Sequence, residues 1–384
     1  MNGVLLISRK YFRATILLAL LVIAGRTAFG EKYQDCTPSF PFKQQWLGAD
    51  DAYSIPLKDE RDVWIFGDTL YGRKRVIVGD EPRMVRNTIG ISTCKAGKWN
   101  IDYVIRKDAH GNFRDFFEPQ HPKTWYWPMD GVEINGELWV TLLCVRNSPE
   151  GVNNGFGFEL CGTDLAHVTG LEHPAQKWKI SYQPLAKEDL HANPTSSAVV
   201  KDGFLYLYAN ADEQKAIQLT RIPVAGLVHA EEAMEYLGRD GEWHKGYQPK
   251  EAMAVMEPGA SEMSVRYHPA MKQWVSVLLN PDLFSGGEVW VRFAPKMRGP
   301  WSKPEVVYHV PEMNTKSIGY DKDIFCYAGK EHPEFEKSGE LIFTYACNMM
   351  KPKKLETRTD IYFPKVVQMA MPSPSMHPQE EAEK

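Results

Sequence analysis

Alternating hydrophobic and polar positions recur along the chain in a repeated pair of segments. Each pair has a short alternating stretch, a turn containing Gly, Asp, Asn or Lys, and a second stretch rich in aromatic and branched residues. Alternation with a period of two is typical of half-buried β-strands, and a polar turn between two of them indicates a β-hairpin. Five hairpins are predicted, at residues 53–68, 132–143, 197–210, 263–280 and 332–348.

The predicted hairpins are evenly spaced. One chain-long period is typical of radial repeats, in which sheets cover their faces and edges against neighbouring sheets. The sequence therefore predicts an all-β fold, a five-bladed β-propeller with a central channel, over residues 31–371. A pair of β-sandwiches is the competing fold, but it predicts neither this period nor matching hairpins. Equivalent positions of the second strands recur about every 70 residues, at Val63, Leu138, Leu205, Val275 and Leu341.

The two ends of the chain depart from this pattern. Arg9, Lys10 and Arg13 precede an apolar run at 14–24, and small residues follow at 28–30. These features are typical of a secretory signal peptide, and the run is shorter than the about 20 residues of a membrane span. We expect residues 1–30 to be removed, leaving a secreted or periplasmic protein without a membrane span. An uncleaved anchor is the alternative, and residues 372–384 are expected to be a disordered tail.

All six cysteines follow the expected cleavage site. An even number of cysteines in an exported chain permits up to three disulfides. The pairs Cys144–Cys161 and Cys326–Cys347 are consistent with disulfides because each pair flanks adjacent predicted strands. Free buried thiols are the alternative.

Composition and motifs narrow the classes of function. The formal net charge is −4 and no basic stripe stands out, so a nucleic-acid partner is not predicted. The chain has no G-x-S-x-G elbow, P-loop or Rossmann fingerprint. We expect no cofactor and no metal-ligand set, with a structural calcium ion bound by channel Asp and Asn residues as the open alternative.

Acidic residues fall where a propeller would bring the strand ends together. Within each blade, the first strand would start and the second strand would end at one mouth of the channel. Asp50, Asp130 and Glu262 precede the first strands of three blades. Carboxyls sharing one confined mouth resist ionising together, and this raises the pKa of at least one of them. A protonated acid beside an ionised carboxylate suits cleavage of glycosidic bonds, so these three residues are predicted to be catalytic.

Other polar and aromatic residues near the same mouth are predicted to bind substrate. Arginine and asparagine can hold sugar hydroxyls or keep a carboxylate ionised, and a loop tryptophan can stack on a sugar ring. Strand-ending Asn is also a common turn residue, so a purely structural role is the alternative for Asn210. The predicted binding residues are Asp51, Asp68, Arg86, Asn87, Trp127, Arg146, Asn210 and His332.

Several of these segments resemble one family. Residues 48–57 (GADDAYSIPL) and 63–69 (VWIFGDT) resemble the opening of domain-of-unknown-function family 4185. Residues 87–92, 127–131, 262–267 and 332–334 are similar to its later blocks. The family is similar to five-bladed propeller glycosidases, and some members belong to glycoside hydrolase family 183, which cleaves D-arabinan internally. The resemblance implies Asp50 as a catalytic carboxylate with Asp130 as its partner, and it supports Glu262 less strongly. Asp51 departs from the small residue usual at its position.

The leading hypothesis is therefore a secreted glycoside hydrolase that acts on a polysaccharide or oligosaccharide, such as a D-arabinan or another furanose-containing glycan. Asp50 and Asp130 would form its acid and base pair. A non-catalytic glycan-binding propeller is the first alternative. A propeller scaffold for protein partners is the second.

Overall fold

The computed structural model of the chain describes residues 36–75, 83–148, 156–211, 216–284 and 287–373. The expected signal peptide and residues 374–384 of the expected tail lie outside this part of the chain. Within the described ranges, none of the helices has both the length and the apolar character needed to cross a bilayer.

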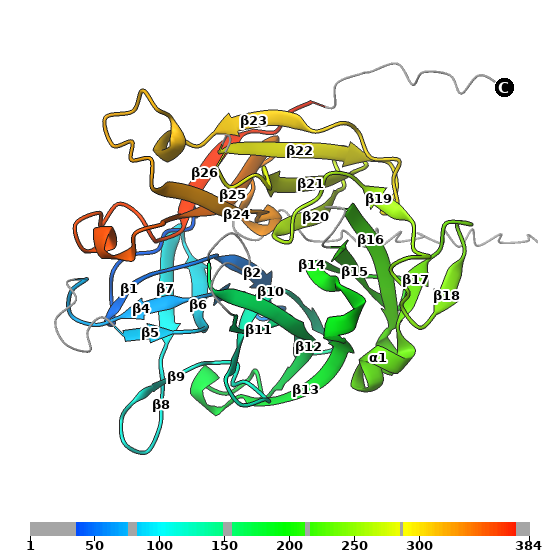
Figure 1. The fold of residues 1–384 in the computed structure, drawn as a ribbon, viewed down its shortest axis with the longest axis horizontal. Helices are drawn as coiled ribbons and strands as arrows, with labels where there is room; N and C mark the ends of the chain where they lie inside the picture. The colour runs from blue at the N-terminus through cyan, green and yellow to red at the C-terminus, as the bar shows by residue number, and fades with distance from the viewer. Residues whose placement is uncertain (1–35, 76–82, 149–155, 212–215, 285–286, 374–384) are drawn as a thin grey trace, which may run out of the picture.

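Antiparallel β-sheets make up most of the structure, and five larger sheets follow one another along the chain (Figure 1). The first sheet contains β2 (Tyr53–Pro56), β3 (Arg61–Phe66), β6 (Thr88–Lys95) and β7 (Lys98–Val104). The second contains β10 (Thr124–Ile134), β11 (Glu137–Asn147), β12 (Phe158–Thr169) and β13 (Lys179–Ala186). The third contains β14 (Ala192–Lys201), β15 (Phe204–Ala211), β16 (Ala216–Pro223), β17 (Glu235–Leu237), β18 (Trp243–Lys245) and β19 (Ala254–Met256).

The fourth and fifth sheets complete the series. The fourth contains β20 (Met263–His268), β21 (Gln273–Leu279), β22 (Glu288–Ala294) and β23 (Glu305–His309). The fifth contains β24 (Ile324–Glu331), β25 (Glu340–Met349) and β26 (Lys365–Ala370). Smaller sheets are formed by β1 (Trp46–Ala49), β4 (Thr69–Tyr71) and β5 (Arg83–Val85), and by β8 (Arg106–Lys107) and β9 (Phe113–Arg114).

Helices are short and lie in the connections. The α-helix α1 spans Ala230–Ala233. The 3-10 turns are η2 (Ala175–Lys177), η3 (Glu188–Leu190), η5 (Val224–His229), η6 (Pro311–Met313), η7 (Pro333–Phe335) and η8 (Pro352–Glu356).

The five sheets surround a common centre, with their first strands innermost (Figure 1). β10 contacts β2 and β14, and β20 contacts β14 and β24. The last sheet meets the first through Thr344, whose hydroxyl donates to the Ala52 carbonyl at 3.1 Å, and through a 2.6 Å hydrogen bond between Ser54 Oγ and His332 Nδ1. A separate hydrophobic cluster lies between each pair of neighbouring sheets, including the fifth and the first. Burial of apolar side chains between neighbours therefore holds the ring together.

The structure confirms the second strand of each predicted hairpin, because β3, β11, β15, β21 and β25 contain the five equivalent residues. The turns Asn135-Gly136 and Asp202-Gly203 have positive φ at both residues, as two-residue hairpins with twisted strands require.

The prediction placed the first strands of three hairpins too late in the sequence. β10 begins at Thr124 rather than after Asp130, β14 begins at Ala192, and β24 ends at Glu331, before the predicted strand begins. Pro333, which cannot donate a backbone hydrogen bond, instead lies in the 3-10 turn η7. The innermost strands are buried on both faces, so alternation does not mark their starts.

Three disulfides link the described cysteines, including both pairs suggested by the strand order. Cys144–Cys161 joins β11 to β12, and Cys326–Cys347 joins paired residues of β24 and β25. Cys36–Cys94 ties the start of the described chain to β6 across 58 residues. No cysteine in this part of the chain is free. Such disulfides are typical of an extracellular or periplasmic protein.

Candidate active site

Three carboxyl groups meet where β2 and β20 begin. Asp50 and Asp51 lie in the short connection between β1 and β2, and Glu262 directly precedes β20. The Tyr53 hydroxyl connects two of them, because it lies within hydrogen-bonding distance of both Asp51 Oδ1 (2.9 Å) and Glu262 Oε1 (3.2 Å). The Asp51 and Glu262 carboxyls also lie close enough to one another to share a proton. Asp50, Asp51 and Glu262 are called the acid cluster below.

A tight crossing of the backbone sets the positions of the two aspartates. The Asp50 N–H donates to the Asp68 carbonyl at 3.0 Å, and the Gly67 N–H donates to the Asp50 carbonyl at 3.2 Å. A Cβ atom on Gly67 would lie 2.9 Å from Asp51 Oδ2, so any larger residue there would displace the Asp51 carboxylate. Asp51 adopts a φ of 61°, a left-handed conformation that aspartate tolerates better than most residues. The crossing leaves Asp51 buried and Asp50 partly exposed.

Tyrosines from the fifth sheet and its connections reach the same place. Tyr327 donates a hydrogen bond to Asp50 Oδ1, and Tyr362 donates to Asp50 Oδ2 at 3.3 Å. Tyr362 also donates to the Asp68 carbonyl at 2.9 Å. The Ala328 N–H donates to Glu262 Oε2 at 3.2 Å. The first, fourth and fifth sheets thus all contribute to the acid cluster.

Asp68 extends the cluster toward solvent. Its carboxylate accepts a hydrogen bond from Arg86 Nη1 at 3.0 Å and one from Trp127 Nε1 at 3.3 Å. The Arg86 guanidinium lies over the Trp125 ring, 4.4 Å from its centroid. Asp68, Arg86 and Trp127 therefore form one partly exposed group beside Asp50.

The acid cluster favours protonated carboxyls. Burial, and then the charge of Asp68, raise the pKa of Asp50 well above its usual value. Burial and the Glu262 charge do the same to the pKa of Asp51. Burial also raises the pKa of Glu262, although its hydrogen bond with Asp51 and the nearby Lys330 ammonium oppose that effect. Burial raises the pKa of Asp68 to about 6, with Arg86 opposing. Near neutral pH, protonated and ionised carboxyls therefore lie side by side.

Asp130 does not lie in the acid cluster. It is fully buried in the middle of β10, where Arg266 Nη2 donates to its two oxygens at 3.1 and 3.2 Å. The N–H groups of Ala198 and Gly131 also donate to it, at 2.8 and 2.9 Å. Burial alone would raise the pKa of Asp130, but Arg266, Lys330 and these N–H groups hold it below its usual value. Asp130 is therefore a fully buried carboxylate whose ionised form is favoured by its neighbours, and the prediction that it faces the mouth was wrong.

Lys330 connects the two groups of acids and was not predicted. It is 1% exposed, its Nζ lies 3.9 Å from Asp130 Oδ2, and it donates to the Met129 carbonyl. Its ammonium also lies over the Tyr53 ring, 3.9 Å from the centroid. Burial lowers the pKa of Lys330 to about 8, although Asp130, Asp51 and Glu262 oppose that shift.

The side chains of two predicted binding residues are buried and form hydrogen bonds inside the protein. Asn87 is fully buried, donates to the Phe117 and Tyr126 carbonyls, and accepts from the Phe117 N–H. His332 is also fully buried between Ser54 and Thr344, and burial lowers its pKa to about 3. Neither side chain can touch a substrate, so these two predictions were wrong.

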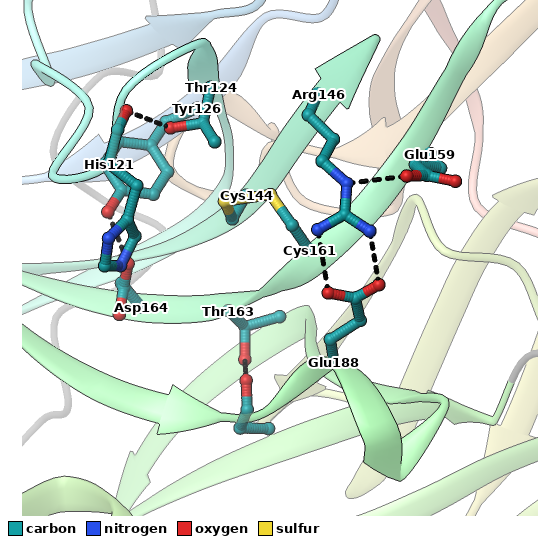
Figure 2. The surroundings of a disulfide bond; sticks show 11 residues. His121, Thr124, Tyr126, Cys144, Arg146, Glu159, Cys161, Thr163, Asp164 and Glu188 are labelled. Carbon is teal, nitrogen blue, oxygen red and sulfur yellow. Dashed lines mark hydrogen bonds and ion pairs between the residues drawn. A yellow bond between two sulfur atoms is a disulfide. The ribbon is translucent and has the colours of Figure 1, made fainter. Parts of the chain in front are cut away.

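Arg146 lies near the Cys144–Cys161 disulfide (Figure 2). Its Nε is 2.6 Å from Glu159, and its two terminal nitrogens form a forked pair with Glu188 at 2.9 and 2.6 Å. This pair ties the end of β11 to η3. Asn210 lies near the end of β15 opposite Asn193, and no contact joins it to the acid cluster within the described ranges.

The missed site residues come from parts of the chain without a distinctive sequence signal. Tyr327 and Lys330 lie on β24, the strand whose position was mispredicted, and Tyr362 follows η8. Tyr53 lies within residues 48–57, where the alternating pattern predicted only a strand residue. A correct start for β24 would have placed Tyr327 beside Glu262 and Asp50.

A hollow of about 480 Å³ lies elsewhere, lined by residues that include Arg106, Glu118 and Tyr182. It contains no member of the acid cluster and no pair of carboxyls. We therefore place the candidate site at the acid cluster rather than in the hollow.

Comparisons with solved structures give the fold. A protein of Bacteroides ovatus ATCC 8483, solved as a candidate hydrolase, is 19% identical with a TM-score of 0.64, and the match covers 84% of this chain and 85% of that one. The chain shares the fold of that protein. No curated protein matches the chain.

Weaker structural matches include glycoside hydrolases. A GH43_1 enzyme of Xanthomonas citri, complexed with xylotriose, is 10% identical with a TM-score of 0.46, over 85% of this chain and 88% of that one. An exo-β-1,3-galactanase of Phanerochaete chrysosporium is 12% identical with a TM-score of 0.42, over 83% of this chain and 63% of that one.

The family assignment corrects the resemblance drawn from the sequence. The family that matches is a domain of unknown function, DUF5005, over residues 33–371. The resemblance to family 4185 was wrong, and the D-arabinan expectation loses its basis with it. The chain belongs to the DUF5005 family.

Proposed function

We propose that this chain is a glycoside hydrolase whose reaction takes place at the acid cluster. In this proposal the five sheets are the blades of a five-bladed β-propeller, and the acid cluster lies at one mouth of its central channel. The contacts of the innermost strands and the hydrophobic clusters between neighbouring sheets support that architecture. The three disulfides favour an extracellular or periplasmic reaction, with residues 1–30 as the export signal.

The observation that carries the proposal is the meeting of two carboxyls, Asp50 and Glu262, whose pKa values are raised to different extents in a partly exposed place. Asp50 and Glu262 are both partly exposed, whereas Asp51 is buried between them and Tyr53. Glycosidic bond cleavage needs one carboxyl that donates a proton and one that is ionised. Raised pKa values keep the first kind available near neutral pH.

The groups around Asp50 and Glu262 indicate which of the two donates a proton and which is ionised. Asp50 has the negatively charged Asp68 and Glu262 nearby, so it is the proton donor to the leaving oxygen. Glu262 has the Lys330 ammonium nearby and accepts hydrogen bonds from Tyr53 and the Ala328 N–H, so it is the ionised partner. As the bond to the leaving oxygen breaks, the Asp50 proton moves to that oxygen. Glu262 either takes a proton from the attacking water or attacks the anomeric carbon itself.

The group beside Asp50 supplies the contacts to sugar. The Trp127 ring offers a face or edge to a pyranose or furanose ring, and Asp68 and Arg86 can exchange hydrogen bonds with its hydroxyls. This combination of an aromatic ring, a carboxylate and a guanidinium fits a neutral polysaccharide or oligosaccharide. Asp51 acts through Glu262, with which it shares a proton, and is a positioning residue.

The proposal is tested by reducing-end release from a panel of xylan, galactan, arabinan and their oligosaccharides. We expect release from at least one glycan by the native protein, and a loss of about 10²–10⁴-fold in Asp50→Asn and Glu262→Gln. Arg146→Met, which lies outside the cluster, is the control and keeps native release. Retention on a glycan affinity gel with no release by the native protein would instead indicate a binding propeller.

A further inference from the structure

A second group of titratable side chains lies at the other end of β20 and β24, away from the acid cluster. β20 runs from Met263, next to Glu262, to His268, and β24 runs past Ala328 to Glu331. His268 and Glu331 therefore meet where the two strands end. Glu336, which directly follows η7, completes the group.

The three side chains face one another closely. His268 Nε2 lies 2.7 Å from Glu331 Oε1, and His268 Nδ1 lies 3.8 Å from Glu336 Oε2. One possible ligand atom from each residue lies within 4.8 Å of the corresponding atoms of the other two. The Glu331 and Glu336 side chains are 0% and 7% exposed, and the His268 side chain is 11% exposed. The group is thus nearly closed, with one edge of the imidazole open to solvent.

An unsatisfied oxygen points to a ligand. Glu331 is 2% exposed, and its Oε2 is buried with no hydrogen-bond donor among the residues that the structure describes. A buried carboxylate oxygen without a partner is costly. The Arg266 guanidinium, which interacts electrostatically with Glu331, is committed elsewhere, because its terminal nitrogens donate to Asp130, Ser197 and backbone carbonyls.

Hydrogen bonds from backbone N–H groups help to fix the positions of Glu331 and Glu336. The Glu331 N–H donates to Ser264 Oγ at 3.0 Å, and the Ile342 N–H donates to Glu336 Oε1 at 3.1 Å. The second bond fixes one oxygen of Glu336, while its other oxygen is the one near His268. A hydrogen bond of this second kind, to a carboxylate that could bind a metal ion, is the usual support of a metal site.

We propose that His268, Glu331 and Glu336 bind a divalent metal ion of the Zn²⁺ or Mn²⁺ class. One imidazole nitrogen and two carboxylates suit such ions, and two carboxylates balance a charge of two. Ca²⁺ is a poorer match because it takes six to eight oxygen ligands. The site joins the end of the fourth sheet to the end of the fifth, so the ion stabilises the ring rather than taking part in hydrolysis.

A proton shared between the two glutamates is the metal-free explanation of the same geometry. Burial, and then the Glu331 charge, raise the pKa of Glu336 well above its usual value. The two explanations differ in one respect. Only metal binding requires the fold to become more stable when a metal ion is added.

The test is thermal unfolding and calorimetric titration of the EDTA-treated mature chain with ZnCl₂, MnCl₂ or CaCl₂. At a metal concentration of 100 times Kd, we expect the Tm to rise by about 3–5 °C with Zn²⁺ or Mn²⁺. The rise is expected to be lost in Glu331→Gln and in Glu336→Gln, whose neutral amide imitates a protonated carboxyl and so preserves the fold. Glu334→Gln is the matched control, because this buried glutamate of η7 bonds to Ser54 instead, and it keeps the rise.

Absence of both a Tm rise and binding heat with Zn²⁺ and Mn²⁺ would overturn the proposal. So would a rise that survives Glu336→Gln and Glu331→Gln, because the ion would then bind elsewhere. Loss of the rise in Glu334→Gln alone would also overturn the assignment. Anomalous diffraction from Zn²⁺-soaked crystals is expected to place the ion between His268, Glu331 and Glu336.

Discussion

Asp50 and Asp130 are both aspartates near the centre of the ring, but their neighbours differ. Asp50 is partly exposed, accepts hydrogen bonds from two neutral tyrosine hydroxyls and lies near other carboxyls. Asp130 is fully buried, and Arg266 and Lys330 lie 3.1 and 3.9 Å away. Burial acts on both in the same direction, so the cations decide the outcome. The charges that face a central aspartate therefore decide whether its pKa is raised or lowered.

Separating the roles of the two carboxyls that we propose as catalytic is expected to give the largest effect. Glu262→Ala should lose about 10²–10⁴-fold in kcat/KM on every substrate, because the ionised partner is removed. Asp50→Asn should lose much less on a 4-nitrophenyl glycoside than on an oligosaccharide, because a good leaving group needs no proton. Initial rates on both substrate types measure the difference. Equal losses for Asp50→Asn on the two substrates would contradict its role as proton donor.

Removing the cation beside Asp130 is expected to be the largest stability change. Arg266→Met leaves a fully buried carboxylate with only the more distant Lys330, and breaking such a buried pair costs about 3–5 kcal/mol. Urea unfolding at pH 7 measures the free energy of unfolding. A loss below about 1 kcal/mol would mean that Asp130 is not the structural anchor described above.

The pH dependence of stability should distinguish carboxyls whose pKa is raised by folding from carboxyls whose pKa is lowered. Asp68 has a folded pKa of about 6, so its contribution to stability is fully present below the unfolded value and is lost as pH rises through about 6. Asp130 has a lowered folded pKa, so its contribution is present above the unfolded value and is lost as pH falls through the folded value. In Asp68→Asn, the loss between about pH 4 and pH 6.5 should shrink by about 2 kcal/mol.

Urea unfolding at half-unit pH steps checks this prediction. The loss of stability toward acid pH should persist in Asp68→Asn, because Asp130 is unchanged. A variant curve parallel to the native curve between pH 4 and pH 6.5 would show that burial does not raise the pKa of Asp68.

The smallest effect is expected at Arg146, the exposed counterpart of Arg266. Its side chain is 38% exposed and pairs with Glu159 and Glu188 in contact with solvent (Figure 2). Exposed ion pairs contribute about 0–1 kcal/mol and are screened by salt. Arg146→Met should therefore change the free energy of unfolding by less than about 1 kcal/mol, and 1 M NaCl should remove the difference. A loss comparable to that of Arg266→Met would remove the contrast between the two arginines.

Local sequence patterns were enough to predict the second strand of each hairpin. Turn residues such as Asn135-Gly136 and the alternation around Leu138 depend only on nearby positions. The start of β10 could not be predicted in this way, because Trp125 and Asp130 lie on an inner strand that is buried against neighbouring sheets. That error moved Asp130 to the mouth in the prediction.

The acid cluster was predicted in part, and its limits have a similar cause. Asp50 and Glu262 precede strands that begin where the alternation begins, so their common position followed from the repeat. Tyr327 and Lys330 reach them from the fifth sheet, and no local pattern records which residues of two sheets face one another. The sheet-to-sheet register, on which the chemistry depends, appears only in three dimensions.

The most direct test measures activity and stability together in Asp50→Asn and Asp130→Asn. The account predicts that Asp50→Asn loses reducing-end release about 10²–10⁴-fold on the responsive glycan while its free energy of unfolding at pH 7 stays equal or rises. Asp130→Asn should instead lose about 3–5 kcal/mol of stability. An Asp50→Asn protein that is folded and fully active, or an Asp130→Asn protein as stable as the native one, would contradict the account.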